Sequence, residues 1–149
     1  MQIGIDLGAT KIEYVVLDSN NSEIVRQREN TPSNYKKLLE TISSIIKRLS
    51  TKYNQNLNVG ICHPGSMDSK GKVFNTYNLK CIKDKKIKND LSSLIPNKLK
   101  FENDANCFAL SESIDGVAKD YSSVFGIILG SGTGGGYVIN KKIIRGANH

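Results

Sequence analysis

The first thirty residues constrain the fold most strongly, because they contain three short β-rich runs in immediate succession. Ile3 and Ile5 alternate with small or polar neighbours over residues 2–6, and a second apolar run occupies 12–17 after a tight turn. A third run, about 23–29, follows a segment of turn-forming residues. We therefore expect a hairpin extended by a third strand, with all three strands antiparallel.

An amphipathic helix is expected next in the chain. Its start is indicated by the segment 31–33, with sequence Thr-Pro-Ser, and its end is expected near Tyr53. Six apolar residues recur between these points at helical spacing: Leu38, Leu39, Ile42, Ile45, Ile46 and Leu49. These residues predict one continuous apolar face.

The remainder of the chain mixes strands and helices, which indicates an α/β domain. Residues 67–97 are polar and irregular, with a short helix expected around Leu91, and no internal repeat is evident along the chain. The other expected elements are strands at 57–62, 99–102, 124–129 and 137–140, a helix at 105–118, and a further strand beginning at Lys142.

Composition excludes several classes of protein. A chain of 149 residues has room for one compact domain, and its apolar runs are far too short to span a bilayer. With no secretion signal at its start, we expect it in the cytoplasm. The net charge of +7 includes a lysine-rich stretch at 80–88, which we interpret as a solvated loop and not as a nucleic-acid site. The three cysteines do not have zinc-site spacing.

The turn after the first strand has the composition of a phosphate-binding turn. Gly8 would allow backbone N–H groups to approach an anion, while Thr10 adds a hydroxyl and Lys11 a positive charge. Asp6, at the strand end, is suited to hold Mg²⁺ through water. The alternative, that this is an ordinary hairpin turn, remains open from these residues alone.

A second candidate phosphate-binding loop lies at 130–136, where five of seven residues are glycine between two apolar runs. So many glycines carry a conformational entropy cost that a simple connection does not require. The segment lacks the Gly-Lys-Ser/Thr ending of a P-loop, and strand-like residues follow it where a dinucleotide-binding motif requires a helix. A flexible hairpin connection is the alternative interpretation.

The segment 102–106, Glu-Asn-Asp-Ala-Asn, lies where a strand is expected to end and a helix to begin. Asn103 or Asp104 is suited to be the helix N-cap. A carboxylate at a strand end, in a domain with two candidate phosphate loops, is also suited to accept a proton from an attacking hydroxyl. Loop residues at 64–66 and Asn78 suit sugar hydroxyls, although the same residue types are common in turns.

The order of these motifs resembles the ROK family of bacterial sugar kinases and sugar-responsive repressors. The resemblance is specific over 3–11, 102–112 and 125–136, and the order of motifs covers nearly the whole chain. It implies an α/β fold, namely a ribonuclease-H-like lobe of the actin and hexokinase type, with a mixed sheet and flanking helices. It also implies that residues 1–149 form the N-terminal phosphate- and sugar-binding lobe, with the C-terminal lobe absent from this chain.

By this resemblance the protein is an ATP- and Mg²⁺-dependent kinase of the fructokinase, glucokinase or N-acetylglucosamine kinase type, acting on a hexose or N-acetylhexosamine. Asp104 would be the catalytic base. Residues that would bind the ATP phosphates are Asp6, Gly8, Thr10, Lys11, Gly130, Ser131 and Gly132. Residues that would bind the sugar are Gly65, Ser66, Asn78, Asn103 and Asp104.

Three departures from the family pattern affect these expectations. His63 occupies a usually apolar position, and Lys83-Asp84 stands where Asn-Gly is common. The chain also ends before the family's zinc motif and adenosine-binding lobe, so alone it is expected to be catalytically incomplete. A sugar-binding half-domain and a sugar-responsive regulator are the alternatives. No nucleic-acid or membrane partner is expected, and homodimerisation is left open.

Overall fold

The structure of the chain is a computed structural model that describes residues 1–130 and 132–146. Contacts along the chain divide it into two compact units, the first from Met1 to Phe101 and the second beginning at Glu102. None of the helices in the described part of the chain is long and apolar enough to cross a membrane.

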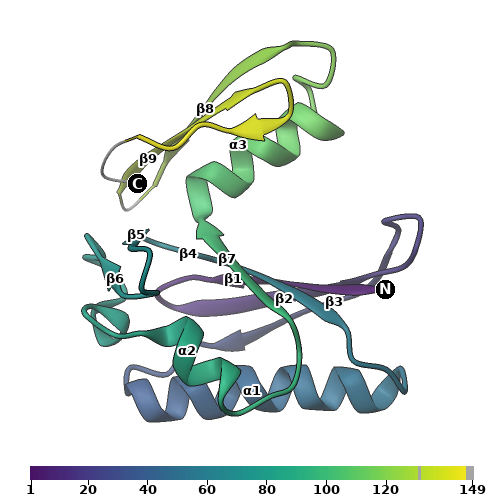
Figure 1. The fold of residues 1–149 in the computed structure, drawn as a ribbon, viewed down its shortest axis with the longest axis vertical. Coiled ribbons are helices and arrows are strands. Elements are labelled where there is room, and N and C mark those ends of the chain that lie inside the picture. Colours follow the sequence, from purple (N-terminus) through teal and green to yellow (C-terminus); the bar gives the residue numbers. More distant parts are fainter. Residues whose placement is uncertain (131, 147–149) are drawn as a thin grey trace. The chain divides into compact units, whose positions relative to one another are not determined.

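The first unit is built on a five-stranded mixed sheet with the strand order β3-β2-β1-β4-β7 (Figure 1). The predicted opening is confirmed, because β1 pairs antiparallel with β2 and β2 pairs antiparallel with β3. β4 pairs parallel with β1 on its other side. The strands are β1 (Gln2–Leu7), β2 (Lys11–Leu17), β3 (Glu23–Asn30), β4 (Asn58–His63) and β7 (Leu99–Asn103).

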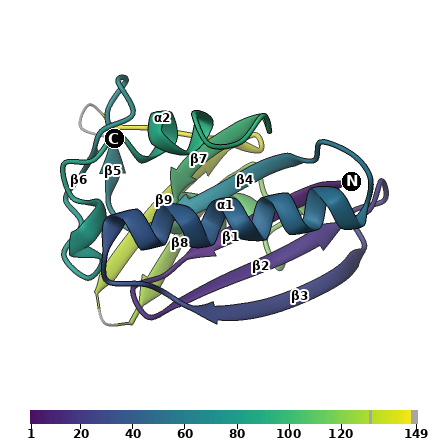
Figure 2. The ribbon, with the colours of Figure 1, turned by 90° about the horizontal axis from the view of Figure 1, so that it is seen from below.

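Helix α1 (Tyr35–Lys52) lies across one face of this sheet (Figure 2). It begins after Asn34, whose side chain accepts a hydrogen bond from the Lys37 N–H, so the helix starts slightly later than the segment 31–33 indicated. The residues of β1 and β2 that point toward the helix are at most 2% exposed. They are Ile3, Ile5, Leu7, Ile12, Tyr14 and Val16. Together with the apolar face of α1 they form the core of the unit.

The polar segment between β4 and β7 is more regular than its sequence indicates. The expected short helix is present as α2 (Ile87–Ser92). A small hairpin, formed by β5 (Ser66–Met67) and β6 (Val73–Phe74), and a 3₁₀ turn at Lys80–Ile82 precede it. Buried side chains, including Ile82, hold this segment against the core.

The second unit consists of one helix on a three-stranded antiparallel sheet with the order β10-β9-β8. Its elements are α3 (Asp104–Ile114), β8 (Ser123–Leu129), β9 (Thr133–Ile139) and β10 (Lys142–Ile143). The helix ends at Ile114, four residues before the predicted end, and Asp115 caps it through its backbone N–H. Gly116 follows, and it has low helix propensity.

The predicted glycine loop was too long, because Gly134, Gly135 and Gly136 belong to β9. Two of these glycines serve helix packing. A Cβ on Gly136 would lie 2.4 Å from the carbonyl oxygen of Ala105, and a Cβ on Gly134 would lie 3.1 Å from the Ala105 Cβ. The glycines therefore allow α3 to approach the sheet closely.

Candidate functional site

The turn between β1 and β2 is held in one conformation by hydrogen bonds. The Gly8 N–H donates to the Lys11 carbonyl at 3.0 Å. The hydroxyl of Thr31 donates to the Gly8 carbonyl at 2.8 Å, and the Thr31 N–H donates to the Thr10 carbonyl at 3.0 Å. A Cβ on Gly8 would lie only 2.9 Å from the Lys11 carbonyl oxygen, so this narrow turn requires glycine.

The side chains of this turn lie at the surface. Asp6 and Thr10 are exposed, and the Cys62 thiol donates to the Asp6 carboxylate with an Sγ–Oδ1 distance of 3.2 Å. The Lys11 ammonium donates to the Asn30 side-chain oxygen at 2.5 Å. The turn therefore presents a carboxylate, a hydroxyl and an ammonium group on a rigid backbone. This set fits a phosphate group with its Mg²⁺.

The first segment predicted to bind sugar leaves the sheet at the same edge as this turn. β1 and β4 are parallel, with Asp6 opposite Cys62, so their carboxyl ends lie side by side. Gly65 follows β4 with φ of 89°, and a Cβ there would lie 2.6 Å from the Phe74 carbonyl oxygen. Ser66, opposite Phe74 in the small hairpin, is half-buried.

Two further residues of this region differ sharply in exposure. Asn78 is exposed in the loop after β6. His63, the unusual residue before the Pro-Gly turn, is buried with only 1% of its surface exposed. Its ring lies 6.1 Å from that of Phe101, measured between centroids. His63, the last residue of β4, therefore packs inside the protein directly before the turn.

In the second unit, the junction of β7 and α3 assigns different roles to its two polar residues. Asn103 is the N-cap, and its side-chain oxygen accepts from the Ala105 N–H at 2.9 Å and from the Asn106 N–H at 3.2 Å. Asp104 is the first residue of the helix, half-buried, with one carboxylate oxygen 2.9 Å from the Ala105 nitrogen. Asn103 is therefore the residue that caps α3, and Asp104 occupies the first position of the helix.

Glu102 was not singled out from the sequence, although it lies in β7 directly before Asn103. Its carboxylate accepts from the Asn103 N–H and from the Asn106 side chain, each at 3.0 Å, and it forms an ion pair with Arg145. Burial is the largest influence on the Glu102 pKa and raises it, but these three donors together lower the pKa below its usual value. The sequence signal was its place two residues before Asp104.

The second predicted phosphate loop is only partly described. The Gly130 N–H donates to the Gly132 carbonyl at 2.9 Å, which makes a tight connection between β8 and β9. Both glycines are exposed. Ser131 lies outside the described residues.

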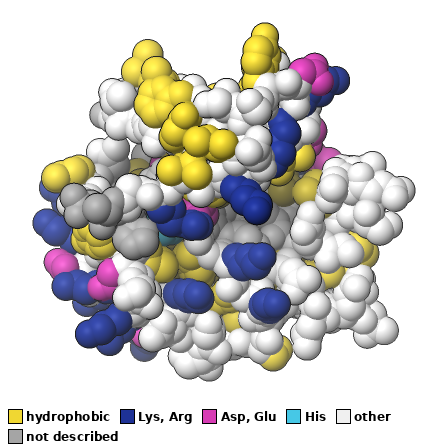
Figure 3. Space-filling model, turned by 45° about the horizontal axis from the view of Figure 1, so that its top comes forward, with side chains coloured by type: hydrophobic (Ala, Val, Ile, Leu, Met, Phe, Trp, Pro, Cys, Tyr) yellow, Lys and Arg dark blue, Asp and Glu magenta, His cyan; other side chains and the backbone are white. Residues whose placement is uncertain are grey.

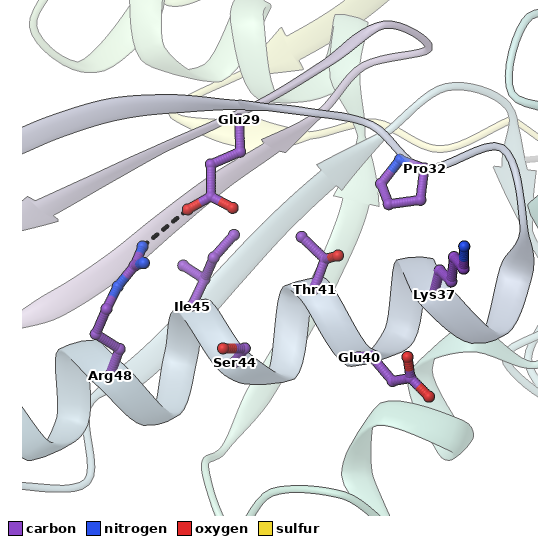
Figure 4. A pocket seen from close by; sticks show the side chains of 8 residues that line it. All are labelled: Glu29, Pro32, Lys37, Glu40, Thr41, Ser44, Ile45 and Arg48. Atoms are coloured by element: carbon purple, nitrogen blue, oxygen red, sulfur yellow. Dashed lines mark hydrogen bonds and ion pairs between the residues drawn. The ribbon is translucent and has the colours of Figure 1, made fainter.

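Two surface grooves of the first unit contain none of the predicted site residues. The larger, about 430 Å³, runs between the end of β3 and α1 (Figure 4). Glu29 and Arg48 point toward each other across it and form an ion pair at 2.9 Å. The smaller, about 240 Å³, lies beside the β5–β6 turn. Neither groove is lined by the residues predicted to bind phosphate or sugar.

Comparisons with known proteins are consistent with this set of motifs. The model of the ROK family matches residues 2–149. The N-acetyl-D-glucosamine kinase of Vibrio parahaemolyticus is 37% identical over 150 residues, which cover 100% of this chain and 50% of that protein. The chain spans about half the length of the curated relatives it matches.

Solved structures share the fold. A ROK family glucokinase from Streptomyces griseus, solved with glucose and AMPPNP, has a TM-score of 0.84 and 28% identity, covering 97% of this chain and 46% of that one. A ROK family transcriptional regulator, a homologue of the Escherichia coli MLC protein, has a TM-score of 0.80 at 18% identity, covering 99% and 38%. The predicted fold class, a mixed sheet with flanking helices of the actin and hexokinase type, is confirmed.

Proposed function

Since this chain belongs to the ROK family, we propose that it supplies the phosphate- and sugar-binding residues of an ATP-dependent sugar kinase. The reaction transfers the γ-phosphoryl group of ATP to a hydroxyl of a hexose or N-acetylhexosamine. Similarity to an N-acetyl-D-glucosamine kinase and to a glucokinase solved with glucose and AMPPNP supports this class of substrates. Because the chain spans half of such relatives, the complete activity requires their second half as well.

The geometry at the start of α3 carries the proposal. Asn103 caps the helix, so the Asp104 carboxylate is held at a strand-to-helix junction without serving as the cap. Asp104 accepts the proton of the sugar hydroxyl as that oxygen attacks phosphorus. Phosphoryl transfer has a loose transition state, so the main contribution of this carboxylate is to orient the hydroxyl.

The phosphates of ATP are assigned to two turns. The first contains Asp6, Gly8, Thr10 and Lys11, where the rigid backbone and exposed side chains support the assignment. The second contains Gly130, Ser131 and Gly132, and the two exposed glycines, which have no side chain, support close approach of an anion to the backbone. When bound, Mg²⁺ would neutralise charge on the phosphate oxygens, and Asp6 is the carboxylate that would hold it.

Sugar hydroxyls are assigned to Gly65, Ser66, Asn78 and Asn103 together with Asp104. The exposed amide of Asn78 and the turn at Gly65, whose positive φ favours glycine, support this assignment. Residues held in such a turn at a strand end are positioned by the sheet. The regulator alternative has only the shared fold in its favour.

The test uses this chain fused to the second half of the Vibrio parahaemolyticus enzyme, assayed for sugar-dependent ADP release with N-acetylglucosamine, glucose and fructose. Asp104→Asn should lower kcat by roughly 10²–10⁴-fold, the usual contribution of a general base. Asp120→Asn, an exposed residue of the same unit, is the matched control and should leave kcat unchanged. Circular dichroism checks that each variant is folded.

Two results would contradict the proposal. Unchanged turnover in Asp104→Asn would remove the role of this residue. A folded fusion protein that releases no ADP with any of the three sugars would remove the activity.

A further inference from the structure

One residue directly after β3 holds the turn between β1 and β2 through two donors. The Thr31 hydroxyl donates to the Gly8 carbonyl with an oxygen–oxygen distance of 2.8 Å, and the Thr31 N–H donates to the Thr10 carbonyl at 3.0 Å. Thr31 lies 23 residues beyond Gly8 in the chain, so these bonds are tertiary contacts. Thr31 therefore belongs to the turn in space, although in the sequence it indicated only the start of a helix.

The bond from the hydroxyl fixes the direction of one amide of the turn. The peptide between Gly8 and Ala9 is trans, so its carbonyl and its N–H point in opposite directions. Because the Gly8 carbonyl points to the Thr31 hydroxyl, the Ala9 N–H points away from Thr31. The Gly8 N–H is bound to the Lys11 carbonyl. Both backbone groups of Gly8 are thus held, and the Ala9 amide has a fixed direction in which to meet an anion.

Thr31 is itself held in place by its neighbours in the chain. Asn30, the last residue of β3, is paired with Lys11 in the register of the sheet. Pro32 follows, and the residue before a proline is restricted to extended backbone conformations. The side chain of threonine is branched at Cβ, which restricts its rotamers. The hydroxyl of this half-buried residue is therefore a rigid donor.

Charge around the turn attracts anions but does not orient them. The Lys11 ammonium donates to the Asn30 side-chain oxygen at 2.5 Å, so it is held beside the turn. Figure 3 shows other Lys and Arg side chains on the surface, in agreement with the net charge of +7. Such charge raises the local concentration of an anionic ligand. The orientation of a bound phosphate depends on backbone donors, and hence on what holds them.

We infer that Thr31 is a positioning residue for the phosphates of the nucleotide, because its hydroxyl keeps the Ala9 N–H directed at the phosphate bound by the turn. The inference rests on the proposed function in one respect, that this turn binds phosphate. Thr31 acts through the turn and does not contact the phosphate itself, since both of its donors are engaged by the Gly8 and Thr10 carbonyls. Without the hydroxyl the peptide after Gly8 can rotate, and phosphate binding weakens.

The first test uses the 149-residue chain and Mg²⁺ with tripolyphosphate, a probe that has the three phosphates of ATP without adenosine. Amide NMR signals of residues 8–11 report binding. Thr31→Val keeps the branched shape and removes the donor, and it should weaken the affinity for tripolyphosphate about tenfold, the usual effect of losing one hydrogen bond. Thr31→Ser keeps a hydroxyl donor and should stay within about twofold of the unsubstituted chain.

A purely structural role of Thr31 predicts a different result. In that case Thr31→Val would lower the melting temperature and leave the affinity of the folded chain for tripolyphosphate unchanged. Thr51→Val is the matched control, because Thr51 is an exposed residue near the end of α1. This control should change neither the affinity nor the melting temperature.

The second test uses the fusion to the second half of the Vibrio parahaemolyticus enzyme. Thr31→Val should raise the KM for ATP about tenfold, while kcat and the KM for the sugar stay within about twofold. This pattern is expected because the hydroxyl holds the phosphates equally in the ground state and in the transition state. A general loss of folded enzyme would instead lower kcat and leave the KM for ATP unchanged.

Three results from the chain would overturn the inference. The first is equal affinity of the unsubstituted chain and of Thr31→Val for tripolyphosphate. The second is a loss in Thr31→Val that is equally large in Thr31→Ser, because the methyl group would then be responsible. The third is a lack of any response of the amides of 8–11 to the probe. A chain that behaves as expected, in a fusion that releases no ADP, overturns the proposed function alone.

Discussion

Replacing Gly136 with alanine tests the close approach between α3 and β9. The added Cβ would lie 2.4 Å from the Ala105 carbonyl oxygen, 2.8 Å from its carbonyl carbon and 2.9 Å from the Asn106 Cα. All three are backbone atoms of the helix, so no side chain can rotate away. Ordinary contacts begin at 3.4 Å, and therefore α3 must withdraw by 1.0 Å, the difference between 3.4 and 2.4 Å.

The cost of this withdrawal follows from packing. Overpacking a buried site typically costs 1–3 kcal/mol, and a gap of about 1 Å along a helix forfeits a large part of its dispersion contacts. We therefore expect a loss of about 3 kcal/mol in the stability of the second unit. Because Ala105 follows Asp104 directly, the same shift displaces the proposed base.

Gly135→Ala is the matched control on the same strand. Its Cβ would point to the other face and lie 3.1 Å from the edge of the Phe125 ring, which is exposed and can move. Neither Gly135 nor Gly136 has a positive φ, so the backbone accepts alanine at both positions. We expect Gly135→Ala to change stability by less than about 1 kcal/mol, with part of any cost offset by a less flexible unfolded chain.

Native-state hydrogen exchange of amides in α3 and β9 measures this difference, because it reports the opening free energy of the second unit separately from the first. Urea unfolding followed by circular dichroism provides an independent check. If the opening free energies of the two alanine variants differ by less than about 0.5 kcal/mol, the packing of α3 on β9 does not require glycine at position 136. That result would refute the reasoning.

Two further predictions concern the site. The Glu102 pKa is lowered in the folded protein, so its contribution to stability is present above the usual glutamate pKa and is lost as the pH falls through the lowered folded pKa. Hydrogen exchange measured over a series of acid pH values should show this loss, and Glu102→Gln should remove it. A result in which Glu102→Gln leaves the acid sensitivity unchanged would assign it to other groups. Gly65→Ala combines a φ of 89° with a Cβ 2.6 Å from the Phe74 carbonyl oxygen, and it should lower the free energy of urea unfolding by about 1–3 kcal/mol. A neutral effect would show that this turn does not require glycine.

Periodicity predicted the elements with long, regular patterns. β1, β2 and α1 were found because each buries one face over six or more residues. β3 has no buried residue, and it was found from its place after the turn-forming segment. The hairpin of β5 and β6 was missed, since strands of two residues carry no measurable alternation. The end of the helix at Ile114 was placed too late because Asp115 and Gly116 are weak local signals.

The site residues themselves could be named from their motifs, but the roles within a motif could not. Asn103 and Asp104 were equivalent as cap candidates. The Ala105 N–H donates to both side chains, and the hydrogen bond from the Asn106 N–H to Asn103 distinguishes them. Glu102 was missed because its partner Arg145 lies far away in sequence. The assignments to ATP and sugar stay predictions.

The sequence by itself determined the order of the longer strands and helices, the α/β class and the places where the glycine turns begin, because these depend on residues close together along the chain. Only the tertiary structure decided which glycines form the turn and which lie in β9 beneath α3. It also revealed that the large apolar residues of β1 are buried, whereas Phe125, Ile127 and Leu129 of β8 are exposed. The physical reason is that burial depends on what packs against a face, and that partner is distant in sequence.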